Sequence, residues 1–339
     1  MGGKTSARKD KKRIMTLKRA FGLGLKFSIS IALIWVLLDK VGVGEAMARL
    51  LSVHPGWLAL AAVIAMVQVL ICTCRWQAVL GGLYVSIGYK KAFKFWYIGA
   101  FFNQALPSSA GGDVVRGYLA YKDGMGLAPV LSSLFLDRAV TVLALVVLVA
   151  SMTPFATLTL ENDRWFIHAV FILLSGCVMG LMMIMLLDST PGAWTKFRVV
   201  KAMHHLAGDT RRVLLHPWTA SQVMVWSILG HINLVLVVYV LFRGVGVDLS
   251  LVDCLLLFPP VLLVQVLPIS IAGWGVREGA MVAVFALVGV SSEAALAVSI
   301  LYGLVLMVTS FPGAVLWLGS NAPADTKDIE AFAESVNQQ

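Results

Sequence analysis

The sequence predicts an all-α membrane protein that crosses the bilayer several times. Hydrophobic residues make up 59% of the 339 residues, and charged residues make up only 13%. Apolar stretches long enough to span a ~30 Å hydrocarbon core recur along the chain, and a soluble core cannot absorb them. One pattern, QxLPxSxxGxxxR, occurs twice in apolar surroundings, from Gln104 to Arg116 and from Gln265 to Arg277. This repeat indicates an internal duplication.

Six stretches are predicted to form spanning helices, because each is apolar over about the thickness of the hydrocarbon core. They lie at 21–38, 57–74, 127–152, 165–187, 218–242 and 293–318. A basic segment, 1–20, precedes the first span, and a polar tail, 319–339, follows the last. The first span is too long for a signal peptide and lacks a small-residue cleavage site, so we expect it to be retained.

The two motif regions, 92–121 and 251–290, are predicted to be broken helical hairpins that enter the membrane and turn back. Pro107 and Pro268 disfavour helix at the preceding residue, and the glycines that follow permit a tight turn. Irregular backbone occurs at membrane depth only where protein or a water-filled cavity surrounds it. Hairpin arms that cross the membrane completely remain the alternative.

The repeat extends beyond the motif, since Trp57 and Trp218 have the same 161-residue separation as the two motifs. Each half is predicted to contain a span, a surface helix, a span, a broken hairpin and a span, with repeat 1 over 21–152 and repeat 2 over 165–318. An odd number of spans in each half implies that the second half is inserted upside down. The surface helix of repeat 2 is expected at 200–215, where apolar residues recur at helical spacing.

The placement of lysine and arginine predicts the orientation. If the N-terminus faces the cytoplasm, the cytoplasmic segments hold twenty basic residues and the segments on the other side hold five. The positive-inside rule then places both termini in the cytoplasm. We expect a bacterial cytoplasmic membrane. The net charge of +9 follows from this topology, so nucleic-acid binding is not expected.

Each motif places an arginine, Arg116 or Arg277, shortly after a helix is expected to start inside the membrane. The first N–H groups of such a helix and its positive dipole end favour an anion, and a guanidinium suits phosphate geometry. An arginine at the bilayer centre costs about 2.5 to 3.5 kcal/mol, so two at matched positions favour a functional role. The predicted lipid headgroup-binding residues are Arg116, Arg277, Asp113, Glu278, Ser109, Ser270, Gly112, Gly273, Asn103, Gln104 and Gln265.

The structural alternative is that each arginine pairs with its own acid and only stabilises its hairpin. Asp113 lies three residues before Arg116, within helical reach. Glu278 is adjacent to Arg277 and is expected to point elsewhere, which leaves Arg277 less constrained.

Asp137 and Arg138 are expected to form a second ion pair inside the membrane, either as a brace for the hairpin or as a ligand contact. The three amides before the breaks are expected to bind freed backbone carbonyls or to line a cavity, and the first role is favoured. These amides are Asn103, Gln104 and Gln265. Farther along, His231 and Asn233 are expected to make helix-to-helix hydrogen bonds.

The four cysteines all fall in predicted membrane segments and are expected to be small core residues. They are Cys72, Cys74, Cys177 and Cys254. No ligand cluster of recognisable spacing is present, so no metal and no cofactor is predicted.

Several of these motifs together resemble the membrane region of lysylphosphatidylglycerol synthases and their flippase-like relatives. They are the Arg75–Trp76 pair, the run 103–118, the Asp137–Arg138 pair and the run 267–278. The resemblance covers about 21–318 and implies translocation of a lipid. The longest soluble stretch, 188–217, is too short to fold an aminoacyltransferase domain, so that activity is not carried over.

The leading hypothesis is a flippase or scramblase that moves a phospholipid or lipid-linked headgroup by alternating access. No GxxxxGK[ST] loop or catalytic motif is recognisable, so the chain is not expected to be an enzyme or to use ATP. The alternative is a membrane-embedded transferase, or an accessory protein, in isoprenoid or hopanoid lipid biosynthesis. Such a role implies a lipid-biosynthesis enzyme as partner. Homo-oligomers are compatible with either hypothesis.

Overall fold

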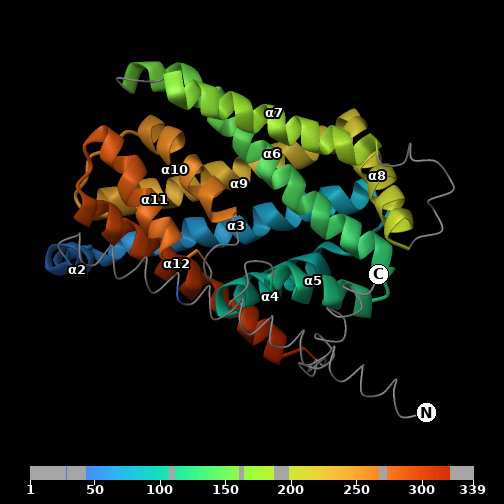
Figure 1. Cartoon of the computed structure of the whole chain (residues 1–339). Helices are drawn as coiled ribbons and strands as arrows, with labels where there is room; N and C mark the ends of the chain where they lie inside the picture. The colour runs from blue at the N-terminus through green and yellow to red at the C-terminus, as the bar shows by residue number, and fades with distance from the viewer. Residues whose placement is uncertain are drawn as a thin grey trace, which may run out of the picture.

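The computed structural model describes residues 28, 43–106, 111–159, 164–186, 198–266 and 273–320. These residues form helices joined by turns, with no strand among them (Figure 1). The helices are α2 (Val43–Ser52), α3 (Pro55–Gly82), α4 (Tyr89–Ala105), α5 (Gly111–Lys122), α6 (Leu127–Thr159), α7 (Arg164–Leu186), α8 (Arg198–Leu215), α9 (Pro217–Gly244), α10 (Leu251–Val266), α11 (Val276–Phe285), the 3-10 helix η3 (Ala286–Val288) and α12 (Ser292–Leu318). Residues 107–110 and 267–272 of the two predicted hairpin turns, and the span at 21–38 apart from residue 28, lie outside the described residues.

Four of these helices are long and apolar enough to cross a membrane. They are α3, α6 over Leu127–Met152, α9 and α12. These helices confirm the spans predicted at 57–74, 127–152, 218–242 and 293–318, and the protein is an integral membrane protein. The segment predicted as a span at 165–187 is helical as α7, with a shorter apolar stretch at Phe171–Leu186.

The two helices that carry the repeated tryptophans start in the same way. Before α3, His54 Nδ1 accepts a hydrogen bond from Gly56 N at 3.1 Å; before α9, His216 Nδ1 accepts one from Thr219 N at 3.5 Å. Proline follows each histidine at the start of the helix, where its missing N–H has no intrahelical partner. The repeated His-Pro pair therefore sets the first turn of both helices.

The helices α3 and α9 pack antiparallel along their lengths. Gly82, the last residue of α3, lies beside the start of α9, because a Cβ added there would be 2.7 Å from Thr219 Cγ2. Gly244, the last residue of α9, lies beside the start of α3, where an added Cβ would be 3.0 Å from Trp57 Cβ. The two ends of this pair define a frame for the molecule. We call them the α2 end, where α3 begins, and the α8 end, where α3 finishes.

The other helices pair across the two halves in matching ways. Helix α4 packs against α12, and α10 packs against α6, so exchanging the halves converts one pair into the other. Helix α4 begins at the α8 end and helix α5 finishes there, where Lys91 Nζ lies 2.8 Å from Asp123 Oδ1. Helix α10 begins at the α2 end and helix α11 finishes there, where the rings of Phe242 and Phe285 lie 4.7 Å apart.

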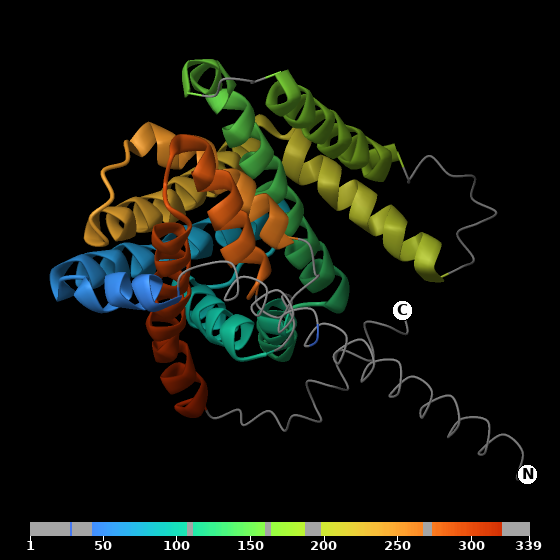
Figure 2. The ribbon, with the colours of Figure 1, turned by 60° about the vertical axis from the view of Figure 1, so that its left-hand side comes forward.

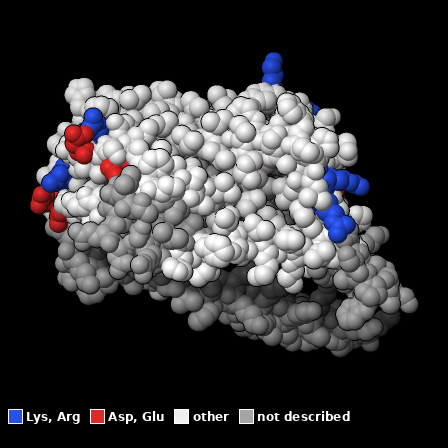
Figure 3. All heavy atoms as spheres, turned by 90° about the horizontal axis from the view of Figure 1, so that it is seen from above, with Lys and Arg blue, Asp and Glu red and all other residues white. Residues whose placement is uncertain are grey.

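Helix α7 lies on the outside of the bundle, against α6 and α8, in both ribbon views (Figures 1 and 2). Viewed from above, charged side chains gather at the two ends of the molecule, and a broad band of other residues separates them on this face (Figure 3). One end shows lysine and arginine, and the other shows both signs of charge. The uncharged band has the character expected of a surface that faces hydrocarbon.

Helix α3 is longer than the sequence predicted. The predicted span stopped at Cys74 and left Arg75 in a cytoplasmic segment, but the helix continues to Gly82. Apolar residues continue after Arg75, so the helix does not end at the charge. Arg75 is buried within the protein. Helix α8 matches the surface helix predicted at 200–215 to within two residues.

Candidate functional site

The first hairpin is held together where α5 begins. Gly112 N donates a hydrogen bond to Asn103 Oδ1 of α4 at 2.9 Å. A Cβ at Gly112 would overlap Gly99 O, so the backbones of α4 and α5 are in contact there. Asn103 therefore satisfies an N–H group at the helix start, whereas the sequence favoured a carbonyl as its partner.

Arg116 is buried behind two aromatic rings and faces two carboxylates. Its side chain is 1% exposed, and its Nη2 lies 3.1 Å from Asp113 Oδ1 and 2.9 Å from Asp137 Oδ2. Its Cζ lies 4.8 Å from the ring centroid of Trp76 and 5.2 Å from that of Trp96. Ring faces attract cations, and a desolvated contact of this kind contributes about 2 kcal/mol. The guanidinium is thus enclosed by charge partners and π surfaces.

Two further arginines extend the cluster of Arg116 and its two carboxylates into a chain of alternating charges. Arg75 Nε lies 2.7 Å from Asp137 Oδ1, and Arg138 Nε lies 2.6 Å from Asp113 Oδ2. The order is Arg75, Asp137, Arg116, Asp113, Arg138, which carries one more positive than negative charge. The predicted ion pair between Asp137 and Arg138 is therefore wrong. Neighbouring residues of a helix point in different directions, and the two side chains take different partners.

Arg277 has a similar environment in the second half. Its side chain is 4% exposed, and its Nη2 lies 2.6 Å from Glu278 Oε1. Its Nε donates to Ser299 Oγ at 3.1 Å, and its Cζ lies 4.9 Å from the Trp274 ring and 5.6 Å from the Tyr302 ring. The expectation that Glu278 points away from Arg277 is therefore wrong.

Glu278 also supports the start of α11. Its Oε2 accepts a hydrogen bond from Gly275 N at 2.6 Å, so one carboxylate binds both the helix start and Arg277. Gly275 and Gly273 have φ values of +85° and +82°, which favour glycine. An added Cβ at Gly273 would lie 3.5 Å from Gln265 Oε1, which places the end of α10 beside this turn.

The two arginine sites meet at one cavity between the halves, which we call the central cavity. Its volume is about 310 Å³, within the usual range for ligand sites. Trp96, which stacks on Arg116, and Tyr302, which stacks on Arg277, both line it. The polar side chains of its wall are Gln68, Asn103, Gln104, Arg138, Tyr302, Thr309 and Ser310. Among the described residues of this wall, amides and hydroxyls accompany one arginine.

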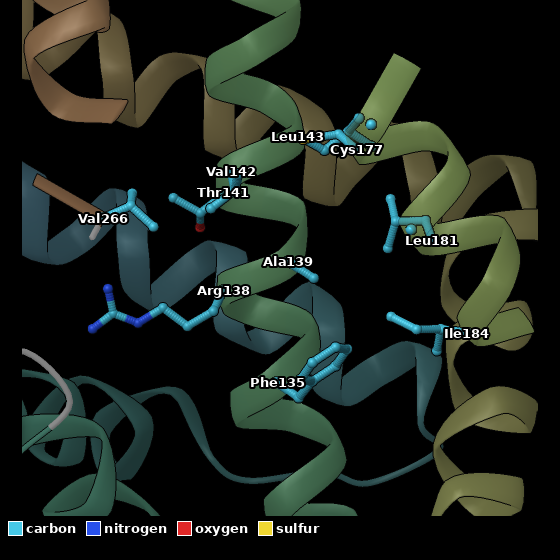
Figure 4. A pocket seen from close by; sticks show the side chains of 12 residues that line it. Phe135, Arg138, Ala139, Thr141, Val142, Leu143, Cys177, Leu181, Ile184 and Val266 are labelled. Carbon is cyan, nitrogen blue, oxygen red and sulfur yellow. The ribbon is translucent and has the colours of Figure 1, made fainter. Parts of the chain in front are cut away.

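A second cavity of about 380 Å³, which we call the lateral cavity, crosses the face of α6 (Figure 4). It is lined by residues of α6 and α7 and by Val266 at the end of α10. Arg138 lines both cavities, and its guanidinium points away from Leu181 and Ile184 of α7. Its side chain is 54% exposed, so Arg138 is the exposed arginine of the five-residue chain.

The structure brings together most of the predicted site residues but gives them different roles. Arg116, Arg277 and their acids form the inner layer, while Asn103 and Gln104 reach the central cavity. Ser109 and Ser270 lie outside the described residues. Arg75 was missed as a site residue. The signal for it was the apolar run that continues past it, which indicates a helix interior.

The remaining polar residues make structural contacts. His231 Nε2 lies 3.0 Å from Thr141 O, and Asn233 Nδ2 donates to Ile64 O at 3.0 Å, as predicted for helix-to-helix bonds. Among the residues described, no three His, Cys, Asp or Glu side chains are grouped so that they could hold a metal ion.

This geometry favours binding of an amphiphile with one negative charge. A cation buried behind aromatic rings is shielded from a ligand, whereas an exposed guanidinium binds phosphate through charge-assisted hydrogen bonds. Arg138 lines both the apolar lateral cavity and the central cavity, which is the more polar of the two. In a phospholipid, the phosphate likewise lies between a polar headgroup and the hydrocarbon chains.

Comparison with known proteins agrees with the resemblance carried by the motifs. The family described as the lysylphosphatidylglycerol synthase TM region matches residues 23–313. Two proteins of Methanothermobacter thermautotrophicus, each described as a UPF0104 membrane protein, are also similar. One is 20% identical over 288 residues, covering 78% of this chain and 85% of the relative; the other is 22% identical over 289 residues, covering 76% and 82%. Because the family match spans most of its length, the chain belongs to the family of the lysylphosphatidylglycerol synthase transmembrane region.

Proposed function

We propose that the protein is a lipid translocase that moves a lipid with an anionic headgroup across the membrane. The observation that carries the proposal is the position of Arg138, which is more than half exposed and lines both the lateral cavity and the more polar central cavity. A lipid crossing a bilayer needs a path for its charged group, because hydrocarbon penalises any charge. Arg138 supplies the opposite charge at that point.

The arrangement of the halves supports alternating access as the mechanism. The equivalent helices α3 and α9 run antiparallel, and the two hairpins enter from opposite ends of the molecule. We propose an inverted repeat with re-entrant hairpins, in which rocking of one half against the other opens the central cavity to each leaflet in turn. Movement of Trp96 or Tyr302 would then uncover Arg116 or Arg277 to the headgroup.

The orientation is part of the proposal. Basic residues at the α8 end include Lys90, Lys91, Lys94 and Lys122. Acidic residues at the α2 end include Glu45, Asp248 and Glu293. The positive-inside rule then places the α8 end, and with it both termini, in the cytoplasm. A bacterial membrane stays a prediction, since the two relatives are archaeal.

We propose transport without enzymatic turnover or ATP. The direction of net movement then follows the lipid gradient or another ion gradient. A homo-oligomer and a partner enzyme of lipid biosynthesis remain predictions of the sequence.

The test is translocation of headgroup-labelled phosphatidylglycerol in reconstituted vesicles, with the outer label quenched chemically. We expect Arg138→Gln to lower the rate about tenfold or more, because a hydrogen bond to a charged group contributes about 1.5 to 3 kcal/mol. Arg138→Lys should retain part of the rate. The matched control is Arg212→Gln, an exposed arginine of α8 that is also paired with an aspartate. Equal rates for Arg138→Gln and the control, at equal incorporation, would refute the proposal.

A further inference from the structure

We infer that the lateral cavity is a binding site for one hydrocarbon chain of the lipid whose phosphate contacts Arg138. The identity of the lipid rests on the proposed function. The binding of its hydrocarbon chain rests on the lateral cavity itself. It adds a substrate requirement: a long flexible chain on the same molecule as the anion.

The wall of the lateral cavity is suited to hydrocarbon. From α6 it includes Phe135, Ala139 and Val142, and from α7 it includes Leu181 and Ile184. Thr141 is a polar member, and its hydroxyl donates to Asp137 O at 2.6 Å within α6. An apolar ligand can therefore cover this wall without leaving that hydroxyl unsatisfied.

Helix α7 leaves a trough beside its packing face. Cys177, Leu181 and Ile184 follow one another at helical spacing and are half-buried against α6. Gly176 and Gly180 line the same cavity, and a Cβ added at either glycine would meet nothing within 4 Å. The missing side chains keep this part of the cavity open.

The two glycines also form a GxxxG pair, which in membranes often packs one helix against another. A second copy of α7 is therefore the competing occupant. However, a helix with its side chains is about 10 to 12 Å wide and does not fit a trough of this volume.

Arg138 fixes the direction of the bound chain. Its guanidinium lies on the side of α6 where Val266 lies, and the α7 side chains lie on the other side (Figure 4). A lipid with its phosphate at Arg138 would extend its headgroup into the central cavity and its chain across α6 toward α7. The two cavities then hold the two parts of one molecule.

The test uses phosphatidylglycerol with a photoactivatable group in mid-chain, and a diacylglycerol with the same chain but no phosphate. After irradiation in vesicles, the cross-linked residues are mapped by mass spectrometry. We expect the anionic probe to label the α6 and α7 residues of the lateral cavity, with labelling at least fivefold lower in Gly180→Leu, which fills the trough. Gly180→Ala should keep most of the labelling. The matched control is Met179→Leu, a volume-conserving change on the neighbouring outward surface of α7, where Met179 is 70% exposed.

Each result separates the chain site from the translocase proposal. If the wild type translocates lipid and Gly180→Leu equals it in both labelling and rate, the chain site is wrong and the translocase stands. If labelling depends on Gly180 and on Arg138 but no lipid is translocated, the chain site stands and the translocase fails. Equal labelling by both probes would overturn the link to the phosphate. Loss of a dimer in Gly180→Leu with unchanged labelling would assign the trough to a second copy and overturn the inference.

Discussion

Arginine side chains perform two different tasks in this protein. Arg116 and Arg277 are 1% and 4% exposed, and each lies between two aromatic rings, with two carboxylates at Arg116 and one at Arg277. They are placed to fix the geometry of the hairpins in this conformation. Arg138 shares the Asp113 carboxylate with Arg116 but lines both cavities. Burial, more than the motif that contains each residue, separates the two enclosed arginines from the arginine that lines the cavities.

Arg116→Ala should destabilise the protein strongly. Removing one member of a buried ion pair leaves the other charges poorly compensated, and the cost is about 3 to 5 kcal/mol. The measurement is thermal unfolding in detergent. Arg212→Ala is the control, because its side chain is 60% exposed and an exposed ion pair contributes about 0 to 1 kcal/mol. Equal unfolding temperatures for the two variants would contradict this role for Arg116.

Gly303→Ala should disturb the second arginine site. The added Cβ would lie 2.5 Å from Arg277 Nη2, and the guanidinium is held between two rings, so overpacking should cost about 1 to 3 kcal/mol. Gly279→Ala in α11 is the control, since nothing lies within 4 Å and alanine favours helix by up to about 1 kcal/mol. Thermal unfolding of both variants gives the comparison. A Gly303→Ala protein as stable as the control would show that Arg277 can move freely.

The sequence predicted which residues gather at the site but not their pairing. Motif spacing placed Arg116 and Arg277 at matched positions, and both do occupy similar environments. Pairing depends on side-chain direction and on contacts between helices distant in sequence, such as Arg75 with Asp137. These contacts carry no local signal, so Arg75 was missed and Arg138 was paired with the wrong residue.

At the scale of helices, the first hairpin depends on the absence of side chains where α4 and α5 meet. Helices α4 and α5 approach closely at Gly99 and Gly112, and the Asn103 amide binds in the same place. The second hairpin uses two glycines with positive φ and a carboxylate cap instead. The two halves therefore stabilise equivalent turns by different local chemistry.

Gly112→Ala should weaken the first hairpin more than Gly303→Ala weakens the second. Its Cβ would overlap a backbone atom, Gly99 O, which cannot rotate away as a side chain can. We expect a loss at or above the upper end of the usual 1 to 3 kcal/mol for overpacking. Limited proteolysis or thermal unfolding in detergent can measure it. The control is Gly81→Ala in α3, where an added Cβ would meet nothing within 4 Å, and a similar loss there would rule out a specific contact at Gly112.

Helix boundaries were predicted well where a local signal exists. The His-Pro pairs mark the starts of α3 and α9, and the tryptophans that follow were placed correctly. The end of α3 was predicted eight residues too early, because Arg75 was taken as the limit of the span. A buried aspartate partner lets the helix carry that charge inside the protein, and only the tertiary structure supplies the partner.

The arrangement of the whole molecule makes the orientation testable. Lys122 lies at the α8 end and Asp248 at the α2 end, and both are exposed. In a background without the four native cysteines, a membrane-impermeant maleimide should reach Lys122→Cys only from the cytoplasmic side and Asp248→Cys only from the opposite side. Labelling of both from one side would overturn the proposed inverted repeat. Labelling of each from the reverse side would keep the repeat and invert the termini.

The whole-molecule architecture was the most predictable level. Hydropathy indicated the helical class and the four spans that the described helices confirm, while the repeat of the two halves stays a prediction. The cavities were not predictable, because a cavity depends on side chains that fail to fill the space between helices. Residues such as Gly180 take part in the lateral cavity without any sequence signal that distinguishes them from packing glycines.

Arg138 belongs to one half only, since the residue 161 positions later is Ser299, which is fully buried. In the proposed translocase, a lipid entering from one leaflet therefore encounters this charge at a different point of its path than a lipid entering from the other. A catalyst without an energy source cannot shift the equilibrium between leaflets. The half-saturating lipid concentrations for inward and outward movement must then differ, and the two maximal rates must differ by the same ratio. Unequal kinetics in the two directions with no net accumulation would be the kinetic signature of this asymmetry.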